Sequence, residues 1–595
     1  MTTSIRALTG RSKIRGVVPC FLVSLIGVFS LCSAAGAQSL MDRYTPVTED
    51  MLLSPPDGEW LMWRRTYDHW GYSPLDQINA SNVGALRLAW AWTLEPGGFQ
   101  ETTPLVHDGV MFLPQACDFV EAVDARDGTL IWEYRRERVE HPTRQACANR
   151  NAALYGDHLI LATHDAYLVA LDAHTGELIW EEQVGDWTIG HHYSGGPQII
   201  KGQIVAGMSG CYIINTGCWI SAHDVETGEE LWRTRTIPRQ GEPGSETWGA
   251  VPDEQRLGGS AWIAPSYDPE LNLIYIGVAV PIPWGSVQRD TGDGDVLYTN
   301  STLALNADSG EIEWYFQHLP GDEWDQDHPF ERILVETEVT PDPDAVTWLN
   351  PDITPGRRKV VTGIPGKPGL VWTLDAATGE FLWARETNYQ NVIVGVDVEG
   401  RRGIANPAIK PSAIEEETLV CPTLNGGGIN WQAVAYSPQT NALYAPTNNT
   451  CMIYSLNPVE PTLGTYHGSA TFRRVQVPNS DEQVGQFTAV EVATGETRWV
   501  YRQRAGIGGS VLSTGGGLVF VTDDARRFRA FDADTGEILW EQILNSSAGG
   551  YPVSYNVDGV QYIAIAAGGG VNYRSITQEI RQRSQGNTLF VFRLP

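Results

Sequence analysis

The 595-residue sequence predicts an all-β fold, an eight-bladed β-propeller with tryptophan-docking motifs, from a repeat, its turns and its composition. The pattern apolar-x-Asp-Ala-x-Thr-Gly-Glu-x-x-Trp is clearest as AFDADTGEILW at 530–540. Each copy is typical of two strands joined by a tight turn in which glycine supplies the positive φ. The 21 tryptophans, 62 glycines and 19 % charged residues favour a well-packed β protein. Because one such unit cannot bury its own apolar faces, several must stack in a ring. Copies end at Trp132, Trp180, Trp232, Trp314, Trp383, Trp499 and Trp540.

The first 37 residues have the pattern of an export signal. Basic residues at 6, 11, 13 and 15 precede an apolar run at 17–29, and Ala35-Gly36-Ala37 provides a small-x-small cleavage site before Gln38. The alternative, a retained membrane anchor, is disfavoured because the run is shorter than the ~18 to 20 residues that a spanning helix needs. We therefore expect a periplasmic mature chain without a membrane span.

The two ends of the mature chain supply strands without a repeat motif. ALRLAWAWTL at 85–94 is an isolated strand near the start, and GVQYIAIAAG and NTLFVFRL lie at the end. A ring closes most simply when both termini build one blade together, which adds an eighth blade to the seven repeats. Residues 38–595 are therefore expected to form a single propeller domain.

Charge and cysteine content restrict the function further. The formal net charge is −30, and removal of the basic signal makes the mature chain more acidic, so nucleic acid is a poor partner and a basic protein a better one. Six cysteines remain in the exported chain, which favours disulfides. Of the 15 possible connectivities we favour pairing between neighbours in the sequence, Cys117–Cys147, Cys211–Cys218 and Cys421–Cys451.

Four segments resemble the quinoprotein alcohol dehydrogenases. They are WIAPSYDPELNLIYIGVAVPIPW (262–284), LYTNSTLALNADSGEIEWYFQHLPGDEWDQD (297–327), GGINWQAVAYSP (427–438) and GVQYIAIAAGGG (559–570). The resemblance covers essentially the whole mature chain, and its GDEWD and GGxNW segments are more specific than the repeats. It implies a periplasmic eight-bladed propeller that oxidises alcohols with pyrroloquinoline quinone (PQQ).

The resemblance also implies site residues. Alcohol oxidation by a quinone needs a carboxylate base beside the reacting carbon, and Asp295 matches the family's catalytic aspartate, whereas Asp290 and Asp293 are expected to be turn residues. Lys367 matches the cation that stabilises the reduced quinone oxygen. Trp262 matches the stacking floor and Arg150 a carboxylate-binding arginine. The alternative for Lys367 is a solvated lysine in a turn, and the alternative for Trp262 is an ordinary core tryptophan. Further cofactor-binding matches are Thr163, Ser209, Asn430 and Trp431, of which the first three could equally be turn formers.

Two departures from the family concern the cofactor's surroundings. Arg144-Gln145 stands where the family has a vicinal Cys-Cys pair. Tyr212 replaces the glutamate and Val280 the asparagine that bind calcium, so Asp295 is the remaining metal ligand, and Leu297 stands where lanthanide-using relatives have a further aspartate. Because Ca²⁺ needs six or more oxygens, we expect a weakly held ion or none.

The sequence thus predicts an alcohol dehydrogenase that passes electrons to a separate soluble cytochrome c or similar acceptor. A wider pocket near Gly426–Gly428 favours secondary or bulky alcohols. The alternative is a non-enzymatic scaffold or sensor propeller with a decayed site, which the lost metal ligands favour and the retained Asp295, Lys367 and Arg150 oppose.

Overall fold

The computed structural model describes residues 40–96, 99–140, 147–212, 217–459, 470–478, 480–569, 573–580 and 586–595. The predicted signal peptide and Arg144-Gln145 lie outside these residues. The described chain is mostly strand, and its α-helices, α2 (Glu49–Leu53) and α3 (Ser286–Arg289), have one turn each. No helix in this part of the chain is long and apolar enough to cross a membrane. The predicted all-β class is confirmed.

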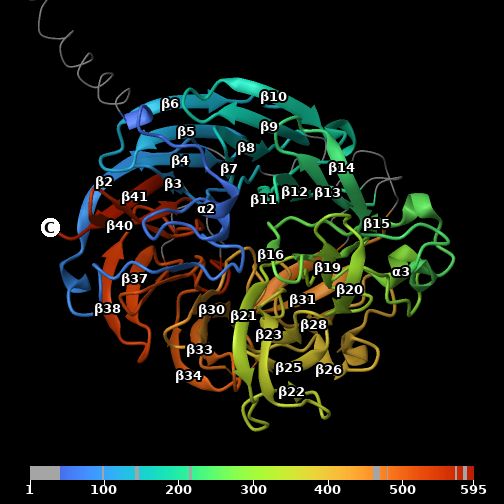
Figure 1. Ribbon diagram of the computed structural model, residues 1–595. Helices are drawn as coiled ribbons and strands as arrows, with labels where there is room; N and C mark the ends of the chain where they lie inside the picture. Colours follow the sequence, from blue (N-terminus) through green and yellow to red (C-terminus); the bar gives the residue numbers. More distant parts are fainter. Residues whose placement is uncertain are drawn as a thin grey trace, which may run out of the picture.

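Eight sheets of at least four strands occur among the described residues, and Figure 1 shows them following one another around a common centre. The first sheet consists of β3 (Leu105–His107), β4 (Val110–Gln115), β5 (Phe119–Asp124) and β6 (Leu130–Arg135). The second consists of β7 (Ala153–Tyr155), β8 (His158–Ala162), β9 (Tyr167–Asp172) and β10 (Leu178–Gln183). The third consists of β11 (Gln198–Ile200), β12 (Gln203–Gly207), β13 (Trp219–Asp224) and β14 (Glu230–Arg235). In each, antiparallel neighbours run from the centre outward.

The middle sheets carry extra strands. In the fourth sheet, β16 (Ser266–Asp268), β17 (Leu273–Gly277), β19 (Ser301–Asn306) and β20 (Ile312–Gln317) are extended by the hairpin of β26 (Ile393–Asp397) and β27 (Arg402–Ala405). In the fifth sheet, β21 (Ile333–Val339), β23 (Gly356–Gly363), β24 (Leu370–Asp375) and β25 (Phe381–Glu386) are extended by β22 (Trp348–Leu349). Two smaller sheets pair β15 (Leu257–Gly258) with β18 (Pro281–Ile282), and β28 (Thr418–Val420) with β31 (Cys451–Leu456) and β32 (Ala470–Val475).

The last sheets include one built from both ends of the chain. After β29 (Ala435–Ser437), β30 (Ala442–Asn448), β33 (Gly485–Glu491) and β34 (Thr497–Gln503) comes a sheet of β35 (Leu512–Thr514), β36 (Leu518–Thr522), β37 (Arg527–Asp532) and β38 (Ile538–Ile543) with β1 (Tyr72–Ser73). The terminal sheet has the order β2 (Arg87–Thr93), β41 (Thr588–Arg593), β40 (Val560–Ala567) and β39 (Val553–Val557). The predicted pairing of the two termini is therefore confirmed.

The repeat tryptophans contact the turn of the following sheet. Trp132 Nε1 donates a hydrogen bond to Ala173 O (3.0 Å), and a Cβ on Gly176 would lie 2.5 Å from the Trp132 ring. Gly176 also has φ +73°, so this turn position needs glycine for two reasons. The same contacts recur between Trp314 and Ala376 O (3.1 Å) and between Trp499 and Ala533 O (3.0 Å).

The segment from Gly58 to Gly71 fastens the sheets to one another from the centre, a role that the sequence did not reveal. Its backbone hydrogen-bonds to innermost strands or their edges in six sheets, because irregular backbone must find partners when it is buried. The bonds are Asn556 N to Gly58 O (3.0 Å), Trp60 with Val106 in both directions (2.9 Å), Tyr267 N to Tyr67 O (3.0 Å), Leu334 N to Asp68 O (3.0 Å), Tyr436 N to Trp70 O (2.8 Å) and Ser513 N to Gly71 O (3.0 Å).

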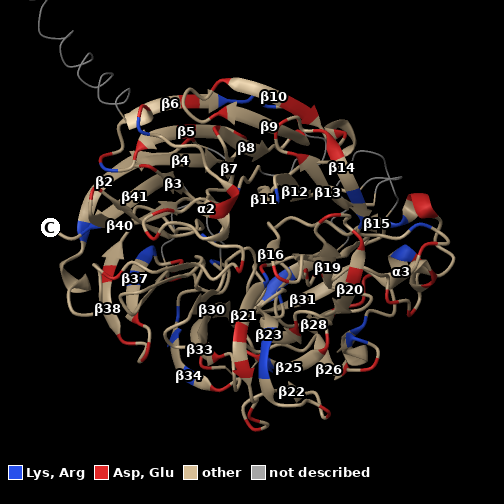
Figure 2. Ribbon diagram, in the orientation of Figure 1, with Lys and Arg blue, Asp and Glu red and all other residues tan. Residues whose placement is uncertain are grey.

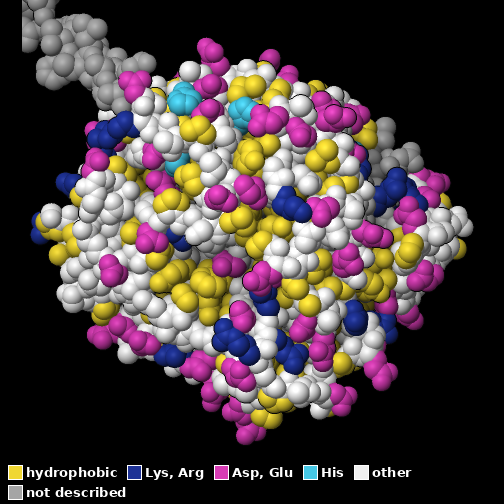
Figure 3. All heavy atoms as spheres, in the orientation of Figure 1, with side chains coloured by type: hydrophobic (Ala, Val, Ile, Leu, Met, Phe, Trp, Pro, Cys, Tyr) yellow, Lys and Arg dark blue, Asp and Glu magenta, His cyan; other side chains and the backbone are white. Residues whose placement is uncertain are grey.

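Acidic side chains are spread over the ring and over the face seen in Figure 3, with basic side chains among them (Figure 2). The net charge of −30 is therefore not confined to one patch. Such a surface repels polyanions in general rather than at one site.

Deleting the last ~20 residues should abolish cooperative unfolding of the whole protein. The deletion removes β41, which lies between β2 and β40 and pairs with both. Without β41, the N-terminal strand β2 has no partner, and the terminal sheet lacks the strand that joins β2 to β40. Thermal melting followed by circular dichroism measures the effect, with deletion of Leu594 and Pro595 alone, which leaves β41 complete, as the control. A long deletion that melts like the parent would contradict closure by the terminal sheet.

Candidate active site

One cavity brings together six of the seven residues predicted to bind the cofactor. It has a volume of about 390 Å³ and takes residues from the loops of several sheets near the centre. The six are Arg150, Ser209, Trp262, Lys367, Asn430 and Trp431. Tyr212 and Val280, which stand at the family's metal-ligand positions, line the same cavity. The sequence thus located this cavity through residues that are far apart in the chain.

Arg150 and Trp262 form a flat wall that carries a guanidinium group. The Arg150 guanidinium carbon lies 4.7 Å from the centre of the Trp262 ring, a cation–π distance. Arg150 Nη2 pairs with Glu101 Oε2 (2.5 Å), and Nη1 donates to Ser194 O (2.7 Å). Burial raises the pKa of the Glu101 carboxyl, while Arg150 opposes the rise. This wall suits a planar ligand that carries negative charge, and the sequence had not indicated Glu101.

Lys367 lies between two buried aspartates at another wall. Its Nζ is 2.9 Å from Asp325 Oδ1 and 2.9 Å from Asp327 Oδ2, and it also donates to Asp325 O (2.9 Å). Burial alone would lower the pKa of Lys367, but the two carboxylates raise it above its usual value, so the ammonium stays charged. Burial holds the pKa of the Asp325 carboxyl well above its usual range, and Lys367 opposes this rise. The arrangement supplies a carboxylate base beside a fixed cation.

Asp295, predicted as base and as metal ligand, lies elsewhere. It lines a second cavity of about 550 Å³, where its carboxylate pairs with Arg402 of β27. Arg402 also pairs with Asp397 of β26, so its guanidinium group links Asp295 to the β26–β27 hairpin. The TGDGDV loop therefore faces this hairpin instead of Lys367, and the role of Asp295 as base and metal ligand stays a prediction. Two aspartates of the GDEWDQD segment, Asp325 and Asp327, lie beside Lys367 instead, and they were not singled out from the sequence.

Thr163 is the one predicted cofactor residue that does not line the cavity. Its Oγ1 donates to Asp165 Oδ1 (2.5 Å) and accepts from Tyr167 N (3.1 Å). These bonds close a turn between β8 and β9, as the turn alternative predicts, and the cofactor role of Thr163 stays a prediction. The ring of His164, the next residue, has its centre 5.2 Å from that of His192, which lines the cavity.

The disulfides pair as predicted: Cys117–Cys147, Cys211–Cys218 and Cys421–Cys451. Cys211 lies between Ser209 and Tyr212, and its partner Cys218 has its sulfur 3.6 Å from Ser260 Oγ. Because Ser209, Tyr212 and Ser260 all line the cavity, this bond fixes part of its wall.

Glycines allow the loop Asn425–Trp431 to cross directly over Lys367. Gly427 has φ +55°, and a Cβ there would lie 2.9 Å from Lys367 Cβ. Gly428 N donates to Lys367 O (2.8 Å). The loop thereby holds the lysine on one side and presents Asn430 and Trp431 to the cavity on the other.

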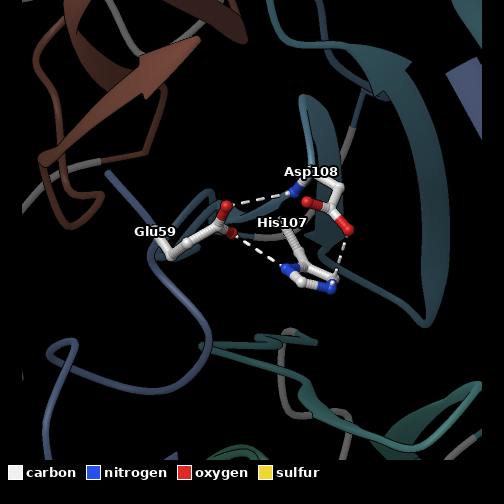
Figure 4. Close-up of side chains that lie close together, drawn as sticks. All are labelled: Glu59, His107 and Asp108. Atoms are coloured by element: carbon white, nitrogen blue, oxygen red, sulfur yellow. Dashed lines mark hydrogen bonds and ion pairs between the residues drawn. The ribbon is translucent and has the colours of Figure 1, made fainter. Parts of the chain in front are cut away.

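A cluster of Glu59, His107 and Asp108 lies apart from this cavity (Figure 4). His107 Nδ1 is 2.9 Å from Glu59 Oε2, while Nε2 is 2.7 Å from Thr45 O and 3.4 Å from Asp108 Oδ2. The two carboxylates therefore face different ring nitrogens. Burial opposes a charge on the ring, but Glu59 and its neighbours raise the pKa of His107 overall. The geometry suits a doubly protonated imidazolium that ties the N-terminal segment to the β3–β4 turn.

The chain matches known proteins over most of its length. The family model "PQQ: Glucose/ethanol/alcohol dehydrogenase, beta-propeller domain" matches residues 60–389 and 481–563. Quinohemoprotein alcohol dehydrogenase ADH-IIG of Pseudomonas putida is 34 % identical over 86 % of this chain and 73 % of its own length. Quinoprotein alcohol dehydrogenase PedH of Pseudomonas putida is 32 % identical over 97 % of both chains.

Solved structures give the same result. A structure of ADHIIG superposes with a TM-score of 0.81 and 31 % identity, covering 93 % of this chain and 82 % of that one. A europium-containing methanol dehydrogenase superposes with a TM-score of 0.81 and 27 % identity, covering 92 % and 100 %. The chain belongs to the family of PQQ-dependent glucose, ethanol and alcohol dehydrogenases, which are β-propeller oxidoreductases.

Proposed function

We propose that this protein oxidises an alcohol to an aldehyde or ketone with PQQ and passes the electrons to a separate acceptor. The observation that carries the proposal is the buried Asp325–Lys367–Asp327 arrangement, which shares its cavity with the Arg150–Trp262 wall. A base, a cation and a flat charged wall in one cavity are what quinone-dependent alcohol oxidation requires.

The cavity residues fit PQQ. Two polar atoms in the wall, Ser209 Oγ and Arg150 Nε, are buried and have no hydrogen-bond partner among the described residues. Buried polar atoms are normally paired, so these atoms are available to a polar ligand. Trp262 and Arg150 would hold its plane and a carboxylate, and Asn430 a further polar edge. When bound, the quinone supplies the acceptor for the hydride of the alcohol.

Asp325 is proposed as the general base in place of Asp295. Its carboxylate would take the hydroxyl proton of the alcohol, which requires the ionised form. Burial favours the protonated form, and the neighbouring Lys367 shifts the balance back toward the carboxylate. Lys367 therefore keeps the base ready and places positive charge at the wall where negative charge develops.

The substrate is proposed to be a secondary or bulky alcohol. Phe99, Leu424, Trp431 and Trp284 line the cavity together with the charged groups, so an apolar substituent has surface to contact. The test uses cofactor-free protein, added PQQ, an artificial electron-accepting dye and a series of primary and secondary alcohols. Turnover of several apolar alcohols supports the proposal. PQQ binding without turnover of any alcohol would favour the scaffold or sensor alternative, and a sharp preference for methanol would contradict the substrate class.

Calcium fits this cavity incompletely. PQQ and Ca²⁺ are typical cofactors of the family, and Ca²⁺ takes six to eight oxygen ligands. Here Asp325 and Asp327 are both bound to Lys367, Val280 supplies no side-chain oxygen, and Tyr212 supplies only a phenol. These residues therefore do not form a complete calcium site.

We predict that calcium does not reactivate the enzyme stoichiometrically. After treatment with a chelator, activity with PQQ should be retained or should recover only at calcium far above the protein concentration, because Lys367 already pairs with both carboxylates. The measurement is the dye-linked rate against added calcium. Tight recovery at one ion per protein would show that the cavity supplies ligands beyond these residues.

The remaining proposals concern the ring and its partner. We infer that the eight sheets are the blades of one closed propeller domain that starts near Gln38, supported by the tryptophan contacts between sheets and by the terminal sheet. We also infer export to the periplasm, and a basic soluble cytochrome c or similar acceptor, which the net charge of −30 would attract.

A further inference from the structure

The loop Asn425–Trp431 is held by side chains that come from later parts of the chain. Tyr573 Oη donates to Gly426 O (3.2 Å), and Arg474 Nη2 donates to Asn425 O (2.5 Å). Tyr551 Oη donates to Trp431 O (2.6 Å). These hydrogen bonds hold both ends of the loop that presents Asn430 and Trp431 to the cavity.

Two of these side chains form one unit. The guanidinium carbon of Arg474 lies 5.2 Å from the centre of the Tyr573 ring, within cation–π range. Tyr573 is fully buried, and burial raises its pKa far above the usual value, so its hydroxyl stays protonated and can donate. A Cβ on Gly506 would lie 2.3 Å from the ring, so Tyr573 has little room to move. Trp431 packs against the same apolar cluster as Tyr573.

The short C-terminal segment that carries Tyr573 is itself fixed. Ile576 O accepts hydrogen bonds from Gln476 Nε2 (2.9 Å) and Arg504 Nη2 (2.5 Å). Arg504 also pairs with Glu579 (2.6 Å). The segment of Tyr573 is therefore held by residues that directly follow β32 and β34, which are not part of the loop.

We propose that Arg474 and Tyr573 are positioning residues that clamp the Asn425–Trp431 loop in the shape that binds the cofactor. The glycines of this loop give it many conformations when it is released. Holding Asn425 O and Gly426 O removes that freedom before binding. The loop therefore loses less conformational entropy when the cofactor binds, and the affinity for the cofactor is higher. The clamp acts through the loop, since Tyr573 does not line the cavity. The inference rests on the proposed function in that its ligand is PQQ.

The test compares Tyr573→Phe with Tyr555→Phe. Each change removes one hydroxyl from a fully buried tyrosine that donates to a backbone carbonyl, but Tyr555 bonds Ala125 O (2.7 Å), outside the cavity. Hydrogen exchange of the peptide that contains Gly426–Gly428 is measured in cofactor-free protein, and PQQ affinity by quenching of tryptophan fluorescence. Arg474→Gln is measured in parallel.

We expect Tyr573→Phe and Arg474→Gln to speed exchange in the loop and to weaken PQQ binding about three- to tenfold, the loss of about one hydrogen bond. Tyr555→Phe should lower the melting temperature without either effect. Exchange in Tyr573→Phe equal to the parent overturns the clamp, whether or not PQQ binds. Faster exchange with unchanged PQQ affinity overturns its role in the cofactor site. A parent that does not bind PQQ, with faster loop exchange in the variants, would overturn the proposed function while leaving the mechanical clamp supported.

Discussion

Replacing Asp325 by asparagine should lower kcat by at least about 10²-fold, because the amide has nearly the same shape but cannot accept the proton of the alcohol. Asp295→Asn should keep kcat within a factor of about three, since Asp295 pairs with Arg402 in the other cavity. The measurement is the dye-linked rate of PQQ-loaded protein at saturating alcohol.

PQQ affinity is the control for this comparison. Asp325 is bound to Lys367 and does not contact the Arg150–Trp262 wall in the described structure, so cofactor binding should change little in Asp325→Asn. If Asp295→Asn loses activity and Asp325→Asn does not, the original assignment from sequence was correct and the base acts in the second cavity. Loss in neither variant would place the base elsewhere.

Local and repeated signals in the sequence predicted most of the fold. The Asp-x-x-Thr-Gly turns and the closing tryptophans place strands at fixed spacing, and the strands at 85–94 and 587–594 lack partners of their own kind, so they pair with each other as β2 and β41. The Gly58–Gly71 segment could not be predicted in this way. Its function depends on one or two hydrogen bonds to each of six separate sheets, and no periodic pattern in the sequence records such bonds.

The site shows a similar division. Arg150, Trp262 and Asn430 were found through the resemblance, and the structure places them around one cavity. The sequence favoured Asp295 as base, whereas the fold places Asp325 beside Lys367. Both aspartates lie in acidic loops, and only the fold determines which loop faces Lys367. Glu101 and Tyr573 were not found because each acts on another cavity-forming segment, Arg150 or the loop at Gly426, through a contact that is distant in sequence.

Lys367→Met should reduce kcat/KM at neutral pH by about 10²-fold or more and should move the pH profile to higher pH. The parent's turnover should rise with pH as Asp325 ionises, above the usual range of carboxylates, because burial raises its pKa. Removing the ammonium takes away the charge that opposes this rise, so Asp325 and Asp327 are left close together and the pKa of Asp325 increases further. A base that is protonated at neutral pH cannot accept the alcohol's proton, and raising the pH should restore part of the activity.

Lys359→Met provides the matched control, because Lys359 also lies between two carboxylates, Asp268 (2.8 Å) and Glu270 (2.9 Å), but outside the cavity. Its pH profile of turnover should coincide with that of the parent.

The pH dependence of stability tests the same charge pair independently of turnover. A carboxyl whose folded pKa is raised favours the fold at low pH, and this contribution is lost as the pH rises through the folded value. Lys367→Met should therefore lose stability with rising pH more than the parent does. If its activity profile instead coincides with the parent's, Lys367 does not control the base, and the pairing seen at Asp325 and Asp327 has a structural role alone.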